Sequence, residues 1–133
     1  CSSDLRREFM VAEGRALVLV RDHLSAQRGA PVTWRFHFDP AAAAELVGGD
    51  CCIRMGNDET WLLAGPGDRR ARTIEAGWVS PSYGVRHPAA VLAICDAAWP
   101  TALTTIFADR RLSESERADL VALADRTAAS GTP

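Results

Sequence analysis

The chain has 133 residues, a length that suits one domain with one core. Apolar residues make up 47% of it and charged residues 24%, as is usual for a globular protein. The formal net charge is −2, and a protein without a basic balance or a basic stripe is not expected to bind nucleic acid. No apolar run reaches the roughly 18 residues of a membrane-spanning helix, so we predict no membrane span.

The first five residues, CSSDL, form a separate case. Codons for this stretch can match the end of a common sequencing adapter, and the chain does not begin with methionine. We therefore expect residues 1–5 to be a non-native start and the chain to be a fragment of a longer protein. Genuine coding sequence upstream would contradict the first expectation.

Two strands are expected near the beginning of the chain. Residues 8–12 read EFMVA and are followed by a turn. Residues 16–22, ALVLVRD, form a continuous apolar run of strand length, which is typical of a strand buried on both faces. Residues 25–31 are expected to form a loop.

The next segment, residues 32–38, alternates between apolar and polar side chains, which is the period of a half-buried strand. Its apolar face consists of Val32, Trp34, Phe36 and Phe38. Its polar face consists of Thr33, Arg35 and His37.

The middle of the chain is a series of short segments separated by turns. Residues 41–50, with four alanines, either hold one helical turn or form a weakly structured crossing segment. Residues 51–55 and 59–64 are joined by a GND turn and predict a hairpin. After a turn at 65–70, residues 71–76 predict a further strand.

The stretch GWVSPSYGVRHPA, residues 77–89, combines aromatic and basic side chains with two glycines and two prolines. We expect it to connect two strands, the second of them over residues 89–95. The last strand is expected over residues 101–108.

The end of the chain differs in pattern. Ser113 and Glu116 have the spacing of a capping box, which predicts a short amphipathic helix over residues 113–130. The expected apolar face of this helix consists of Leu120, Leu123 and Ala124, with Val121 beside them.

About eight short strands at this spacing predict an all-β fold, an antiparallel β-sandwich with a short C-terminal α-helix. The predicted division is a non-native start at 1–5, a β-sandwich over 6–112 and a terminal helix over 113–130. The absence of alternating long helices argues against a parallel α/β sheet.

The cysteines allow two interpretations. Cys51 and Cys52 point to opposite faces if their segment is a strand. Buried free thiols are the favoured interpretation, and a disulfide from Cys95 to one of the pair is the alternative in an oxidising compartment. No CxxC or Cys/His spacing typical of zinc is present, and the sequence predicts no metal site and no cofactor.

Candidate binding residues lie in the stretch 77–89. Tyr83 can stack on a sugar ring, Arg86 can pair with a carboxylate, and His87 lies beside them. The favoured alternative is a structural corner in which the prolines fix the backbone, the glycines take unusual dihedral angles and Trp78 covers the core.

Arg35 and His37 are a second pair of candidates, on the polar face of their strand. That face either forms one wall of a cleft, is solvated, or contacts a second sheet. A solvated or structural face is the favoured interpretation.

Five segments in this order and spacing resemble the C-terminal β-sandwich region of heparinase II/III-like polysaccharide lyases. They are RREFMVAEGRALVLVRDHLS, VTWRFHFDP, WLLAGPG, EAGWVSPSYGVRHPAAVL and LTTIFADRRLS. The resemblance covers about residues 6 to 112, and its most specific parts are 32–40 and 75–92.

The resemblance implies a bacterial enzyme with an N-terminal α/α toroid followed by the sandwich. Such enzymes cleave uronic-acid-containing polysaccharides by β-elimination, which requires neutralisation of the carboxylate, a base for the C5 proton and an acid for the departing O4. The implied partners are an acidic polysaccharide and the toroid of the same chain. The implied location is the cell envelope or periplasm.

No catalytic residue is carried over from the family. Its key Tyr and one His belong to the toroid, and a further His is expected in an HNTV-like segment that this sequence lacks. The histidines here, His23, His37 and His87, are not in that context. The ligands of the structural zinc known in some family members are not matched either. The chain is therefore expected to be inactive alone, and the alternatives are a carbohydrate-binding module or a structural docking domain.

Overall fold

The computed structural model describes residues 5–12, 14, 16–24, 31–96 and 101–130. These residues form strands and one helix. The bounds are β1 Leu5–Ala12, β2 Leu17–Leu24, β3 Val32–His37, β4 Ala43–Val47, β5 Asp50–Met55, β6 Asp58–Ala64, β7 Ala71–Ser82, β8 Val85–Asp96, β9 Thr101–Ala108 and α1 Glu114–Ser130.

The strands form two antiparallel sheets. The large sheet has the order β1-β2-β9-β6-β5-β4, and the small sheet has the order β3-β8-β7. The predicted all-β fold, an antiparallel sandwich with a short C-terminal helix, is confirmed. Among the described residues the helix is too short and too polar to cross a membrane.

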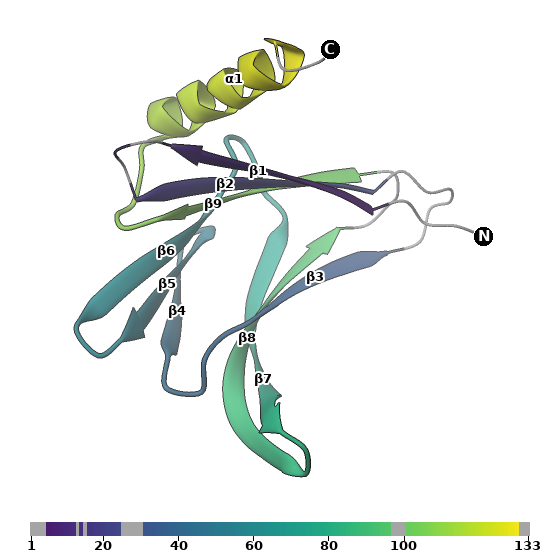
Figure 1. Cartoon of the computed structure of the whole chain (residues 1–133), viewed down its shortest axis with the longest axis vertical. Helices are drawn as coiled ribbons and strands as arrows, with labels where there is room; N and C mark the ends of the chain where they lie inside the picture. The colour runs from purple at the N-terminus through teal and green to yellow at the C-terminus, as the bar shows by residue number, and fades with distance from the viewer. Residues whose placement is uncertain (1–4, 13, 15, 25–30, 97–100, 131–133) are drawn as a thin grey trace.

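The large sheet is the middle layer of the molecule. Figure 1 shows α1 above its β1-β2-β9 part and the small sheet below it. The helix-side core, between α1 and the large sheet, is built on Leu19, Leu63 and Ile106. The inter-sheet core is built on Trp34 and Leu103 with their neighbours.

Two strand patterns predicted from the sequence are confirmed. In β2, Leu19 and Val20 are both buried although they point to opposite faces, because the helix covers one side of the strand and the other side faces the small sheet. In β3, Val32 and Trp34 are buried, whereas Arg35 on the alternate face is exposed.

The segment 41–50 corrects the expectation of a helical turn or a crossing segment. Residues 43–47 form β4, which pairs with β5 at the edge of the large sheet. Gly48 has φ +62° in the turn between these strands, a conformation that glycine adopts without strain. The tight turn and the pairing with β5 override the helical preference of the alanines.

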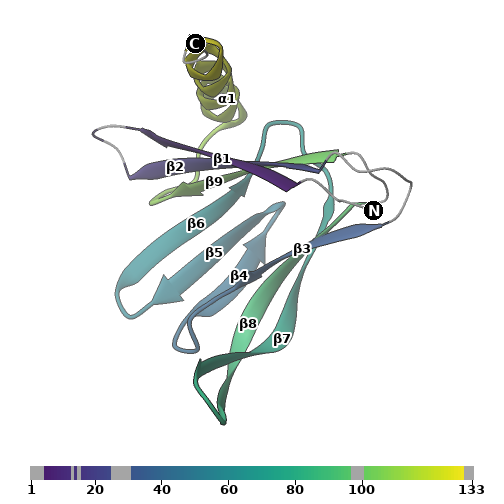
Figure 2. The same cartoon turned by 45° about the vertical axis from the view of Figure 1, so that its right-hand side comes forward.

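The stretch 77–89 also differs from expectation. It connects two strands, as expected, but most of it is itself strand and not a corner, because β7 and β8 continue through it as a long hairpin that turns at Tyr83 and Gly84. Figures 1 and 2 both show this hairpin projecting past the other strands. Trp78, expected in the core, is 56% exposed.

The helix α1 begins with the predicted capping box. Ser113 Oγ accepts a hydrogen bond from the Glu116 N–H at 3.1 Å, and Glu116 Oε1 accepts one from the Ser113 N–H at 3.0 Å. Its buried face differs from expectation in one residue. Leu120 and Ala124 are buried in the helix-side core, but Leu123 is 43% exposed.

Candidate functional site

Among the described residues, no third strand pairs with the distal half of the β7–β8 hairpin. The pairing of β3 with β8 ends at His37 and Val91, and Phe38 N–H adds one bond to the Ala90 carbonyl at 3.1 Å. Residues 77–89 therefore form a two-stranded projection, here called the arm. Most of its described side chains are exposed.

Trp78 and Arg86 lie together on one face of the arm. The Arg86 Cζ atom is 4.9 Å from the centroid of the Trp78 ring, within the range of a cation–π interaction. Trp78 is on the same face of β7 as Ile74, which packs against the inter-sheet core. Trp78, four residues after Ile74, is largely exposed. The face of β7 that packs on the core at Ile74 is therefore open to solvent on the arm.

The arm has an unbalanced charge. Its thirteen residues, GWVSPSYGVRHPA, include Arg86 and His87 and no Asp or Glu. Among the described residues Arg86 forms no ion pair and no hydrogen bond, whereas most described arginines pair with a carboxylate, as Arg7 does with Asp22 at 2.6 Å. The guanidinium of Arg86 is thus held by an aromatic ring while its donors face solvent.

Hydrogen bonding between the Ser80 side chain and backbone carbonyl groups stabilises the tip of the arm. Ser80 Oγ lies 2.9 Å from the Ser82 carbonyl oxygen and 2.7 Å from that of Val85. The register shifts between Val79 and Ser82, which is a β-bulge. Gly84 has φ +78° at the turn, and Tyr83 beside it is fully exposed.

The five candidate binding residues do not form one cluster. Register places Arg35, His37 and His87 on the outer face of the small sheet, away from the inter-sheet core. Arg86 is on the opposite face of β8, and Tyr83 is at the tip. His37 is level with Val91, four residues from His87, which corresponds to about 13 Å along the strand.

The outer-face residues are also less available for an anion. Arg35 Nε lies 3.5 Å from Glu75 Oε2, and both side chains are about half exposed. This carboxylate partly compensates the charge of Arg35. The structure therefore favours the arm over the outer face as an anion-binding surface.

A buried charge cluster at the foot of α1 is a structural contact. Asp50 accepts hydrogen bonds from both terminal nitrogens of Arg117, at 2.8 and 2.9 Å, and from Arg111 Nε at 2.7 Å. Burial alone raises the pKa of Asp50, but the hydrogen bonds from Arg117, the Ala64 N–H and Arg111 outweigh it, so the pKa lies below its ordinary value. Since every charge here has a partner, the cluster is a clamp between α1 and the large sheet.

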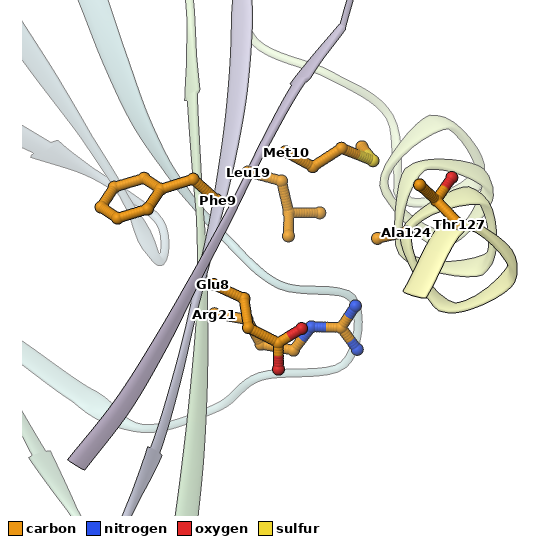
Figure 3. Close-up of a pocket in the computed structure, with 7 residues that line it drawn as sticks. All are labelled: Glu8, Phe9, Met10, Leu19, Arg21, Ala124 and Thr127. Carbon is orange, nitrogen blue, oxygen red and sulfur yellow. The ribbon is translucent and has the colours of Figure 1, made fainter. Parts of the chain in front are cut away.

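A groove runs between β1, β2 and α1 (Figure 3). The residues that line it are Glu8, Phe9, Met10, Leu19, Arg21, Ala124 and Thr127. Its polar groups are mostly occupied within the protein. Arg21 pairs with Asp125 at 2.5 Å, and Glu8 Oε1 is 3.0 Å from His23 Nε2. Among the described residues, Arg21 Nε and His23 Nε2 are buried without a hydrogen-bond partner. The groove offers less to a ligand than the arm does.

The described residues contain no group of three His, Cys, Asp or Glu side chains that could hold a metal ion. Tyr83, the single tyrosine of the sequence, makes no hydrogen bond within the described part of the chain. The structure therefore does not bring it together with any described histidine as an acid–base pair.

Cys51, Cys52 and Cys95 are free thiols. Cys51 and Cys52 are fully buried on opposite faces of β5, as the favoured interpretation expected, but Cys95 is exposed. Burial raises the pKa of the Cys51 thiol to about 11 and raises that of Cys52 as well. None of the three has the environment of an activated nucleophile.

One comparison with known proteins gave a match. A family model described as "Heparinase II/III-like, C-terminal" matches residues 2–118. No curated protein and no solved structure matches the chain. The match covers both sheets, the arm and the start of α1.

Proposed function

Because the chain belongs to the heparinase II/III-like C-terminal family, which relates it to polysaccharide lyases, we propose that it is the β-sandwich part of a bacterial polysaccharide lyase. The parent enzyme cleaves a uronic-acid-containing polysaccharide by β-elimination. The single observation that carries this proposal is the family match over residues 2–118.

The proposal includes that this part of the enzyme is inactive alone. Elimination needs a base, an acid and a group that neutralises the uronate carboxylate at one place. Within the described residues Tyr83 has no hydrogen-bonded partner, and His37 and His87 are about 13 Å apart along the small sheet. This arrangement supports a parent in which other segments supply the acid and the base.

An N-terminal α/α toroid of the same parent chain is the proposed source of those groups. In this arrangement the sandwich supports the toroid and helps to form the wall of the substrate cleft. The proposed location, the cell envelope or periplasm, rests on the family relation, and fractionation of the source bacterium tests it.

The proposal is tested by assaying the 133-residue chain and its full-length parent on alginate and glycosaminoglycans. Elimination creates a conjugated double bond, so an increase in ultraviolet absorbance reports the unsaturated product. We expect product from the parent and none from the chain alone. Product from the chain alone would disprove the proposed inactivity, and a parent without product on any acidic polysaccharide would disprove the lyase.

The exposed arm favours one alternative function, a non-catalytic carbohydrate-binding module. Its exposed aromatic and basic side chains, Trp78, Tyr83 and Arg86, suit sugar contact without chemistry. The coding sequence upstream of residue 6 separates the alternatives. A helical toroid with its Tyr and His, followed by an HNTV-like segment, supports the lyase, and their absence supports the module.

A further inference from the structure

The Trp78–Arg86 pair on the arm has the features of a ligand site. We propose that it binds a carboxylate-bearing sugar residue of a polysaccharide, with the guanidinium on the carboxylate and the ring of the sugar on the exposed indole surface. The chemical class of the sugar rests on the proposed function. The site itself rests on the geometry of the arm.

Arg86 provides the anion-binding part. Its Cζ is 4.9 Å from the centroid of the Trp78 ring, which places the guanidinium over the indole, and within the described residues no carboxylate compensates its charge. A planar guanidinium pairs with a carboxylate through two parallel N–H···O bonds. Because the ring already restricts the side chain, less conformational entropy is lost when that pair forms.

Trp78 provides the stacking part. Although Arg86 lies over its ring, Trp78 remains 56% exposed. The exposed surface of the indole is apolar and contacts water when no ligand is bound. The C–H face of a pyranose ring can cover this surface. Trp78 thus offers an apolar subsite, and Arg86 next to it offers an anion-binding subsite.

The composition of the arm favours a saccharide over a protein partner. The exposed large hydrophobic side chains on its described part are Trp78, Tyr83 and Val85, so only one is aliphatic. Polar side chains lie beside them, namely the hydroxyl of Ser82, the guanidinium of Arg86 and the imidazole of His87. A protein interface of standard size buries about 800 Å² per partner around a closely packed centre, whereas the described part of this narrow hairpin presents three exposed large hydrophobic side chains.

The bulge is what creates the site. If the strands paired without a bulge from Ser82–Val85 onward, Trp78 would be opposite Ala89. Trp78 and Arg86 would then lie on opposite faces of the hairpin. The register shift places Trp78 opposite Pro88 instead, on the face of Arg86. The single hydroxyl hydrogen of Ser80 lies within hydrogen-bond distance of the carbonyl oxygens of Ser82 and Val85, so it can bond either one and holds the bulge without a ligand.

The experiment measures binding of saturated alginate and hyaluronan oligosaccharides to the 133-residue chain by calorimetry, with an oligosaccharide of dextran as the neutral control. Arg86→Gln removes the charge and keeps the approximate size. We expect it to weaken binding about tenfold or more, because both the charge and the paired N–H donors that would hold the carboxylate are lost. Arg86→Lys keeps the positive charge but lacks the planar pair of N–H donors, so this variant should bind with intermediate affinity.

Trp78→Leu should weaken the same binding, and Arg126→Gln is the matched control. Arg126 is an exposed arginine of α1 without an ion pair among the described residues, so its substitution changes the net charge equally. Thermal unfolding of each variant shows that the fold is intact. A loss confined to the Trp78 and Arg86 variants supports the site.

Three results would overturn the inference. They are no binding of either acidic oligosaccharide, equal binding of dextran, and equal weakening by Arg126→Gln and Arg86→Gln. Self-association of the chain that Trp78→Leu abolishes, without sugar binding, would assign the arm to a protein interface instead. The lyase assay of the parent is independent of these results, so failure of this site and failure of the proposed function are distinguishable.

Discussion

Individual side chains in this protein differ sharply in their access to solvent, and the cysteines show this most clearly. Cys51 and Cys52 are completely buried neighbours on β5, whereas Cys95 is exposed near the end of β8. A thiol reacts as the thiolate, so burial and the raised pKa of Cys51, about 11, both suppress reaction.

We therefore expect a thiol-alkylating reagent at neutral pH to modify Cys95 in the folded protein and to spare Cys51 and Cys52. Peptide mapping by mass spectrometry identifies the modified positions. In a denaturant Cys51, Cys52 and Cys95 should all react, and Cys95→Ser should remove the native-state signal of the peptide that holds residue 95, which mapping separates from the peptide that begins at Cys1. Fast native modification of Cys51 would show that β5 is accessible and would contradict the prediction.

Asp50 is the residue on which the helix clamp depends. Substitution with Asn removes the charge that pairs with Arg117, whose side chain is 8% exposed. Breaking a buried ion pair from one side leaves the other charge without compensation. We expect Asp50→Asn to lower the free energy of unfolding by about 3–5 kcal/mol, as measured by urea denaturation.

Asp58→Asn is the control for this substitution. Asp58 is exposed at the start of β6 and makes no ion pair among the described residues, so its substitution should change stability by less than about 0.5 kcal/mol. Equal effects at Asp50 and Asp58 would show that the clamp adds nothing to stability.

At the scale of single elements, the β7–β8 hairpin depends on a close approach at Gly77. A Cβ atom at this position would lie 2.5 Å from Val91 Cγ2, closer than side chains pack, and Val91 is itself 3% exposed. Gly77→Ala should therefore lower the free energy of unfolding by about 1–3 kcal/mol through overpacking.

A double-mutant cycle tests this cause. Val91→Ala removes the methyl group that the new Cβ would meet, so the cost of Gly77→Ala should largely disappear in the Val91→Ala background. If the two substitutions are instead additive in thermal unfolding, the cost comes from the backbone and not from this contact.

The elements also show what sequence patterns can and cannot predict. The alternation in residues 32–38 and the capping box at Ser113 predicted β3 and the start of α1, because both depend on local spacing. The alanine run at 41–44 gave no local signal for β4, since its strand state comes from pairing with β5.

The arm was predicted least well, for a physical reason. A one-residue bulge reverses which side chains share a face. Pro81 lies within the shifted segment and is compatible with a bulge, but proline is equally common in turns, so the sequence does not distinguish the two. Trp78 was placed in the core because large aromatic residues usually lie there, but burial depends on whether another layer stands opposite. The signal that remained was the composition of the arm, with two basic residues and no acid.

At the scale of the whole molecule, the three layers are joined by charged contacts as well as by apolar ones. Asp50 ties α1 to the large sheet. Asp68, whose pKa is also lowered, pairs with Arg70 and Arg72, and Arg70 donates a further hydrogen bond to the Ala102 carbonyl of β9 in the large sheet. For Asp68, burial alone raises the pKa, but the hydrogen bond from Arg72 leads the interactions that outweigh it.

These shifts determine how stability depends on pH. A carboxylate whose pKa is lowered by folding adds stability that is complete above its ordinary pKa, about 4, and is lost as the pH falls through the lower folded value. Urea denaturation between about pH 6 and about pH 2 should therefore show the native protein losing stability on acidification.

The same series on Asp50→Asn isolates the clamp. Its stability should fall less steeply with pH, so that the difference between the variant and the native protein narrows as Asp50 of the native protein becomes protonated. A difference that stays constant down to pH 2 would show that Asp50 does not titrate in this range.

The position of β9 determines when the fold can be completed. This strand, Thr101–Ala108, lies between β2 and β6 and pairs with both, although it follows every other described strand in the sequence. Before it is synthesised, β1-β2 and β6-β5-β4 are two separate half-sheets with open edges. During translation the large sheet therefore cannot close until its last strand is available, and in that interval the nascent chain exposes unpaired edges to aggregation and to chaperones.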